Sequence, residues 1–138
     1  MDAQRQRIAA YAELRDEAGR VLLVRSTDEI GGKWFLPGGG VGFGESPQEA
    51  LHREVLEETG HDIDDIVLKA TLSDVYEWRG QQVHSVRLIY TATVVDLSRP
   101  LQHEIGGSTV EAAWVDTDRL TRLPLARYVA VALGLARG

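Results

Sequence analysis

The sequence has no cysteine among its 138 residues. Zinc–thiolate sites, thiol redox motifs and a disulfide framework are therefore excluded. It also has no apolar run long enough to cross a membrane. The N-terminal residues 1–7 are polar and lack the apolar segment of a signal peptide. We therefore expect a soluble protein that works in the cytoplasm and has no membrane partner.

Basic residues are in the minority, because 15 Lys and Arg face 21 Asp and Glu, for a formal net charge of −6. An extended nucleic-acid-binding surface normally carries a basic excess, so no nucleic acid polymer is expected as a partner. A small anionic substrate is still compatible, since a bound cation can reverse the local field. Linkers, low-complexity blocks and repeats are absent too, and the length suits one domain over residues 1–138.

Strand and helix patterns are mixed along the chain. Apolar and polar periodicity predicts strands over residues 8–14, 21–25, 66–76, 83–95 and 110–115, with a short extended segment at 33–36. Apolar residues recur at helical spacing over residues 125–136, which predicts an amphipathic C-terminal helix. Together with a central helix, this order indicates an α/β class fold, a sandwich with a mixed β-sheet between helices.

The central helix has clear start and stop signals. Ser46 can cap its N-terminus, Pro47 suits the first turn, and Glu49 completes a capping box. Gly60 is a natural C-terminal stop. The sequence therefore predicts a helix over residues 47–59, directly after a glycine-rich loop.

Three carboxylates of this helix, those of Glu54, Glu57 and Glu58, are expected to share one side of it. At about 100° per residue they project within an arc of roughly 100°. Like charges at these spacings repel one another, and a divalent cation is the best reason for the arrangement. Mg²⁺ and Mn²⁺ prefer carboxylate and carbonyl oxygens, and a glycine loop exposes its carbonyls. A metal site of this kind supports attack of water on a diphosphate.

Residues 39–61 resemble the Nudix box, which is a glycine, five residues, a glutamate, seven residues, then Arg-Glu-apolar-x-Glu-Glu-x-Gly-apolar. The matching residues of this chain are Gly39, Glu45, Arg53, Glu54, Val55, Glu57, Glu58 and Gly60. His61 departs from the pattern at its last position, which is usually apolar. The preceding Trp-Phe-Leu-Pro-Gly-Gly-Gly of residues 34–40 also resembles the lead-in of this family. The resemblance implies the family's α/β/α sandwich over nearly the whole chain.

The resemblance also implies a role for each box residue. Glu54, Glu57 and Glu58 would bind the metal, together with the carbonyl oxygen of Gly39. Arg53 would orient the glutamates. One of the box glutamates would take the proton from the attacking water, and the choice among them stays open.

Other residues are candidates for supporting roles. Glu45 would support the junction between loop and helix, and a further ligand or base is expected from outside the box. Glu111 is the first candidate for that catalytic role and Glu104 the second. Arg25 and Lys33 are candidates for contacts with substrate phosphates, against the plainer reading of surface charges. Trp78, near the hairpin tip, is a candidate for a substrate or dimer contact.

These features together predict a Mg²⁺-dependent (or Mn²⁺-dependent) hydrolase that cleaves the diphosphate linkage of a nucleoside triphosphate or a nucleoside diphosphate derivative. Two alternatives stay open, a Nudix domain that binds a nucleotide without hydrolysis and a structural domain with solvated glutamates. Oxidised nucleoside triphosphates, ADP-ribose, nucleotide sugars and dinucleoside polyphosphates are equally compatible substrates. A homodimer is a candidate assembly, because many members of the family form one.

Overall fold

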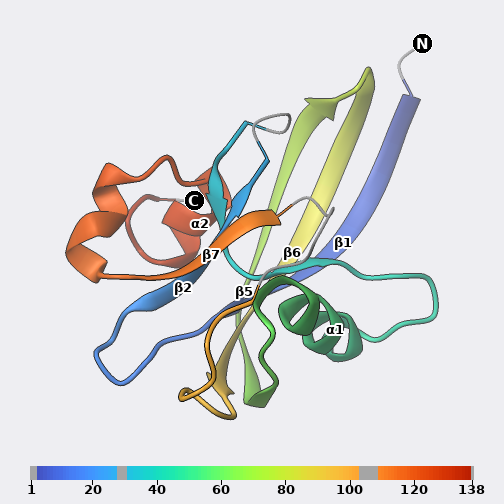
Figure 1. The fold of residues 1–138 in the computed structure, drawn as a ribbon. Coiled ribbons are helices and arrows are strands. Elements are labelled where there is room, and N and C mark those ends of the chain that lie inside the picture. The colour runs from blue at the N-terminus through green and yellow to red at the C-terminus, as the bar shows by residue number, and fades with distance from the viewer. Residues whose placement is uncertain (1–2, 28–30, 103–108, 138) are drawn as a thin grey trace.

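The computed structural model describes residues 3–27, 31–102 and 109–137. Its elements are, in chain order, β1 (Ala3–Glu13), β2 (Val21–Ser26), β3 (Trp34–Phe35), β4 (Gly38–Gly40), α1 (Pro47–Thr59), β5 (Ile63–Trp78), β6 (Gln81–Val94), β7 (Thr109–Val115), the 3₁₀ helix η2 (Thr117–Arg122) and α2 (Arg127–Ala132). Figure 1 shows α1 and α2 on opposite sides of the strands. The predicted α/β sandwich is confirmed by this arrangement.

The strands form two sheets, one in the order β4-β1-β6-β5 and the other in the order β3-β2-β7. In the first sheet β1 runs parallel to β6 and antiparallel to β4. The long strands β5 and β6 form an antiparallel hairpin. The expected mixed sheet is therefore present, and a smaller antiparallel sheet lies beside it.

Two apolar cores hold these layers together. The core against α2 includes Tyr11, Leu23, Trp34, Ile89 and Val129. The core against α1 includes Leu14, Leu22, Leu51, Val55 and Tyr90. Successive residues of a strand point to opposite faces, so β1 and β2 contribute to both cores. This fixes α1 against the sheet on the side opposite α2.

The predicted elements match the structure best where their signals are local. The central helix has the predicted bounds. β1 begins five residues earlier than the predicted strand, because its whole length from Ala3 to Glu13 pairs with β6. α2 ends at Ala132, before the predicted residue 136, and Gly134 just beyond it has a left-handed φ of 76°. The helix η2 was not predicted.

The N-terminal half of β1 and the tip of the β5–β6 hairpin project together beyond the rest of the molecule (Figure 1). At that tip Arg79 and Gly80 have positive φ values of 50° and 78°. Two left-handed residues in succession are typical of the tight turn that matches strand twist. Over the part of the chain that the structure describes, we find no helix with the length and apolarity to span a bilayer.

Candidate active site

The helix α1 is held at both ends and along one side. The Ser46 hydroxyl accepts a hydrogen bond from the Glu49 N–H at 3.1 Å, and the Glu49 carboxylate accepts one from the Ser46 N–H at 3.3 Å. The Gly60 N–H donates to the Leu56 carbonyl and closes the C-terminus. Leu51 and Val55 are buried against the sheet. The charged side of the helix is thereby fixed toward β4.

The strand β4 passes through a narrow space between β1 and α1. A Cβ atom added at Gly38 would lie 2.1 Å from the Ala10 carbonyl oxygen, and one added at Gly39 would lie 2.7 Å from the carboxyl carbon of Glu54. Gly38, whose φ is 142°, has no room for a side chain, and a side chain at Gly39 would displace the Glu54 carboxylate. Glycine is therefore required at position 38, and the two glycines bring the backbone of β4 directly against Glu54 and Glu58 of α1.

The carboxylates of the helix differ in their surroundings. Glu58 is buried, its Oε1 accepts a hydrogen bond from the Gly38 N–H at 2.8 Å, and its Oε2 accepts one from the Thr109 hydroxyl at 3.5 Å. Glu54 accepts a hydrogen bond from Arg53 at 2.9 Å. The Glu57 side chain is 44% exposed and lies 3.7 Å from the Arg53 guanidinium. Glu58 thus ties α1 to β4 and β7, whereas Glu57 faces solvent.

These carboxylates and the backbone of β4 are all hard oxygen donors, which suits Mg²⁺ or Mn²⁺. Within residues 3–27, 31–102 and 109–137, no three acidic or histidine side chains are gathered into a closed metal-binding group. Glu54 and Glu57 lie beside Arg53, whereas Glu58 is hydrogen-bonded to Gly38 and Thr109. The oxygen donors of α1 and β4 therefore suit a hard cation, although each carboxylate has a hydrogen-bond or ion-pair partner in this structure.

Arg53 and Glu45 form a bidentate ion pair that joins the loop to the helix. The Arg53 Nε and Nη2 atoms both donate to the Glu45 carboxylate at 2.9 Å, and Nη2 also donates to the Gly40 carbonyl at 3.3 Å. The Arg53 hydrogen bond, with the Gly42 N–H, lowers the pKa of Glu45 to about 2. The Glu45 and Glu54 carboxylates in turn raise the pKa of Arg53. Through these contacts Arg53 and Glu45 join the glycine-rich loop to α1.

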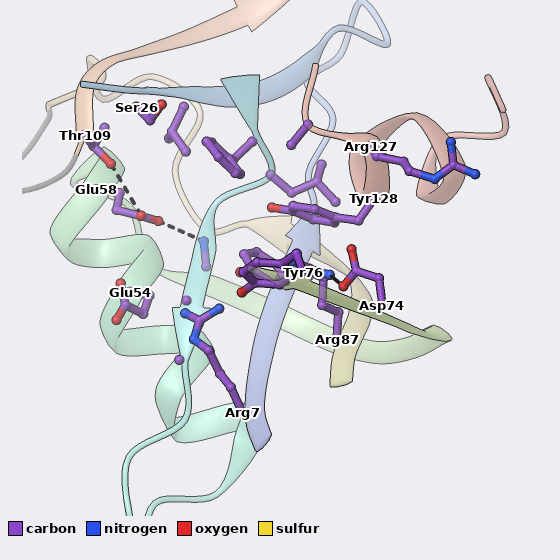
Figure 2. A pocket seen from close by; sticks show the side chains of 18 of the residues that line it. Arg7, Ser26, Glu54, Glu58, Asp74, Tyr76, Arg87, Thr109, Arg127 and Tyr128 are labelled. Carbon is purple, nitrogen blue, oxygen red and sulfur yellow. Dashed lines mark hydrogen bonds and ion pairs between the residues drawn. The ribbon is translucent and has the colours of Figure 1, made fainter. Parts of the chain in front are cut away.

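A cavity of about 540 Å³ opens next to these carboxylates. Figure 2 shows Glu54 and Glu58 on one side of it and Arg7, Asp74, Tyr76, Arg87 and Tyr128 on the other. Gly38–Gly40 also line it, as do Phe35 and Trp78. The cavity therefore joins an acidic end, suited to a cation, to a wall of arginines and aromatic rings, suited to phosphates and a nucleoside.

The wall of the cavity is the face of the first sheet, where three strands bring residues that are distant in sequence into rows. The registers place Arg7 of β1, Ser85 of β6 and Asp74 of β5 in one row. Tyr76 lies in the next row, and its hydroxyl shares a hydrogen bond with the Ser85 hydroxyl at 2.9 Å. Arg7, Ser85 and Asp74 were not predicted, since only the strand register brings them together.

Arg87 lies on the same face and is buried. Its guanidinium forms an ion pair with Asp74 and lies 4.7 Å from the ring centre of Tyr128 and 5.7 Å from that of Tyr76. Burial opposes the charge of Arg87, but the Asp74 carboxylate together with Tyr11 and Tyr128 outweighs this effect, and the pKa of Arg87 is raised. Burial also raises the pKa of Tyr128.

Several predicted site residues lie away from the cavity. Arg25 and Glu111 are paired across β2 and β7, with a 3.1 Å ion pair between their side chains. Neither they nor Lys33 and Glu57 are among the described residues that line the cavity, whereas Trp78 is. Glu104 lies outside the described residues. The roles of Arg25, Lys33 and Glu111 thus stay predictions without support from this geometry.

Known proteins of similar sequence include two whose names refer to RNA or nucleotide phosphates. An RNA pyrophosphohydrolase of Erythrobacter litoralis (strain HTCC2594) is 30% identical over 135 residues, which cover 86% of this chain and 81% of that protein. An 8-oxo-dGDP phosphatase of Danio rerio is 35% identical over 106 residues, which cover 76% of this chain and 30% of that protein.

A solved structure extends the similarity to the fold. The MutT NUDIX hydrolase from Burkholderia pseudomallei has a TM-score of 0.79 and 26% identity, over 96% of this chain and 98% of that chain. The family described as the NUDIX domain matches residues 5–133. With nearly the whole length matched and the box helix in place, the chain belongs to the Nudix family of hydrolases.

Proposed function

We propose that this protein is a Mg²⁺- or Mn²⁺-dependent nucleotide pyrophosphohydrolase. It cleaves the diphosphate linkage of a nucleoside triphosphate or of a nucleoside diphosphate derivative by attack of metal-activated water. The observation that carries the proposal is one cavity with Glu54 and Glu58 of the Nudix box at one end and arginine and aromatic side chains on the opposite wall. A substrate with adjacent phosphates and a nucleoside has matching chemistry at both ends.

Glu54, Glu57 and Glu58 would hold the metal, with the carbonyl oxygen of Gly39. A bound divalent cation lowers the pKa of water and neutralises phosphate charge, which are the two needs of anhydride hydrolysis. Glu58 accepts hydrogen bonds from Gly38 and Thr109, so it is better suited to positioning than to taking a proton. Glu54 and Glu57 are therefore the candidates for the general base.

Arg53 is the cation that lies among the acidic residues of the Nudix box. Arg53 donates to Glu45 and Glu54 and lies near Glu57, so one cation offsets part of the repulsion among the acids. Glu45 stays ionised at neutral pH, and it holds Arg53 in this position. Arg53 thus fixes Glu54 beside the cavity and reduces the repulsion between Glu54 and Glu57.

The names of the relatives support the bond type and leave the substrate open. An RNA pyrophosphohydrolase and an 8-oxo-dGDP phosphatase both act on phosphoric anhydrides of nucleotides, but on different ones. Nucleotide binding without hydrolysis is the second candidate, and the complete set of box glutamates argues against it. A single domain, a homodimer and a cytoplasmic location accompany the proposal as further expectations.

The test is a substrate panel with Mg²⁺ or Mn²⁺, covering nucleoside triphosphates with their oxidised forms, ADP-ribose, nucleotide sugars and dinucleoside polyphosphates. We expect metal-dependent turnover of at least one class. Glu57→Gln should lower kcat by roughly a hundredfold or more, the scale of a lost catalytic proton acceptor. Circular dichroism should show an unchanged fold, because the Glu57 side chain is largely exposed.

The matched control is Glu49→Gln on the same helix, since glutamine also completes a capping box. It should keep its activity. Absence of turnover with every substrate and both metals would overturn the proposal in favour of nucleotide binding alone. Near-full activity in both Glu54→Gln and Glu57→Gln would remove the proposed roles of these residues.

A further inference from the structure

Four of the described residues that line the cavity are arginines from outside the Nudix box, namely Arg5, Arg7, Arg87 and Arg127. Arg87 is buried and already paired with the Asp74 carboxylate. Arg5, near the N-terminal end of β1, and Arg127, at the start of α2, are both exposed. Arg7 lies between Arg87 and these two in depth, and it is the arginine whose surroundings point to a ligand.

Arg7 is a half-buried cation without a carboxylate partner among the described residues. Its neighbours are the phenol groups of Tyr11 and Tyr76. Burial lowers the pKa of Arg7, the two phenol groups outweigh this effect, and the pKa is raised overall. Phenol oxygens can accept hydrogen bonds, but at neutral pH they do not neutralise a guanidinium. Arg7 is therefore a full positive charge on the cavity wall that lacks its own counterion.

Arg7 lies beside the strand β4, close to the Glu54 carboxylate. A Cβ atom added at Gly40 would lie 3.3 Å from Nη2 of Arg7, and one added at Gly39 would lie 2.7 Å from the carboxyl carbon of Glu54. Adjacent Cα atoms are about 3.8 Å apart. Arg7 and Glu54 thus flank neighbouring residues of β4, and Figure 2 shows the Arg7 guanidinium directed at this strand across from Glu54.

We propose that Arg7 binds the substrate's diphosphate group, at the phosphate adjacent to the one held at the carboxylate end of the cavity. This inference rests on the proposed function, because it assumes that a phosphate occupies that end. A guanidinium can donate two parallel hydrogen bonds to one phosphate, and such charged bonds are among the strongest in proteins. A phosphate here supplies the negative charge that Arg7 lacks, because Asp74, the carboxylate in the same row, is paired with Arg87.

The test uses methylenediphosphonate, a diphosphate analogue that cannot be hydrolysed and carries no base or sugar. Its affinity is measured by calorimetry in Mg²⁺ buffer for the wild-type protein and for Arg7→Gln, Arg7→Lys and Arg122→Gln. Loss of a charged hydrogen bond should weaken binding roughly tenfold to a hundredfold in Arg7→Gln. Arg7→Lys should recover part of the affinity, and binding should become less dependent on salt when the charge is removed.

Arg122→Gln is the matched control, because Arg122 is an exposed arginine of η2 that does not line the cavity. Its affinity should equal that of the wild type. With any substrate that the protein cleaves, Arg7→Gln should raise KM more than it lowers kcat. Thermal unfolding of each variant separates loss of binding from loss of folding, and Arg7→Lys keeps the charge if Arg7→Gln does not fold.

The two proposals fail in different ways. Unchanged affinity in Arg7→Gln, or no binding of the analogue to the wild-type protein, overturns the assignment of Arg7 while metal-dependent turnover can still support the hydrolase. Tight binding that depends on Arg7 with no turnover of any substrate supports the assignment and overturns the hydrolase.

Discussion

At the scale of single residues, His61 is the position where the chain departs from the family pattern. Its side chain is 1% exposed, and its Nε2 atom has no hydrogen-bond partner among the described residues. Burial lowers the pKa of His61, and the nearby charge of Arg99 adds to the effect. The folded protein therefore holds this imidazole neutral at a position where an apolar side chain would fit.

This predicts a loss of stability in mild acid. A histidine whose pKa is lowered by folding does not affect the free energy of unfolding well above its unfolded pKa of about 6.5. Below that pH the unfolded chain binds a proton that the folded protein does not, so the free energy of unfolding falls as the pH drops. His61→Leu should remove this pH dependence and also the unpaired nitrogen, whose burial costs about 1–3 kcal/mol. The thermal unfolding midpoint should therefore exceed that of the wild type, by more at pH 5 than at pH 7.5.

The control for this comparison is His52→Gln, because His52 is an exposed histidine of α1. Its unfolding midpoint should follow that of the wild type at both pH values. If the curves of His61→Leu and wild type stay parallel from pH 7.5 to pH 5, the buried imidazole is not the source of the acid sensitivity.

At the scale of elements, the Arg53–Glu45 pair decides how the loop is attached to α1. The Glu45 pKa of about 2 lies below its ordinary value of 4.5, because Arg53 and the Gly42 N–H stabilise the ionised form. A carboxylate with a lowered folded pKa contributes its stability above the unfolded pKa, and loses it as the pH falls toward the folded one. This pair therefore stabilises the junction at neutral pH and fails between about pH 4.5 and pH 2.

Glu45→Gln should accordingly lower the unfolding midpoint at pH 7, because glutamine accepts a hydrogen bond from Gly42 but cannot form the ion pair. The difference from the wild type should shrink steadily between pH 4.5 and pH 2.5, as measured by circular dichroism. A difference that is constant over this range would show that the ion pair contributes nothing to stability.

The helix α1 could be predicted from the sequence, whereas the arginine wall of the cavity could not. The bounds of α1 were predicted because its signals, Ser46, Pro47, Glu49 and Gly60, lie within the helix or next to it. The box carboxylates came from the same local pattern.

Arg7 was missed for the opposite reason. It belongs to a part of β1 that has polar residues on both faces, and it pairs in parallel with Ser85 of β6, far along the chain. Its place on the cavity wall depends on that long-range register, as does the Asp74–Arg87 pair. The predicted phosphate contact at Arg25 rested on closeness in sequence, whereas the strand pairing places Arg25 beside Glu111 on the other sheet.

At the scale of the whole molecule, the two cores are coupled through β1 and β2. Tyr11 and Leu23 belong to the core against α2, while Leu14 and Leu22 from the same part of the chain belong to the core against α1. Neither core can lose its packing without moving strands that also form the other. We therefore expect the chain to unfold as one cooperative unit.

Leu51→Ala tests this expectation from one side only, because Leu51 is fully buried in the core against α1. Removal of a buried leucine side chain should cost about 2–5 kcal/mol of the free energy of unfolding. If the cores are coupled, hydrogen exchange of the slowest amides should accelerate by the same factor on both sides, at Val129 as well as at Val55. Leu56→Ala, at an exposed position of the same helix, should leave both unchanged. If exchange accelerates only on the α1 side, the two cores unfold separately. The cavity would then lie between two independently opening parts of the molecule, and substrate binding would have to hold those parts together.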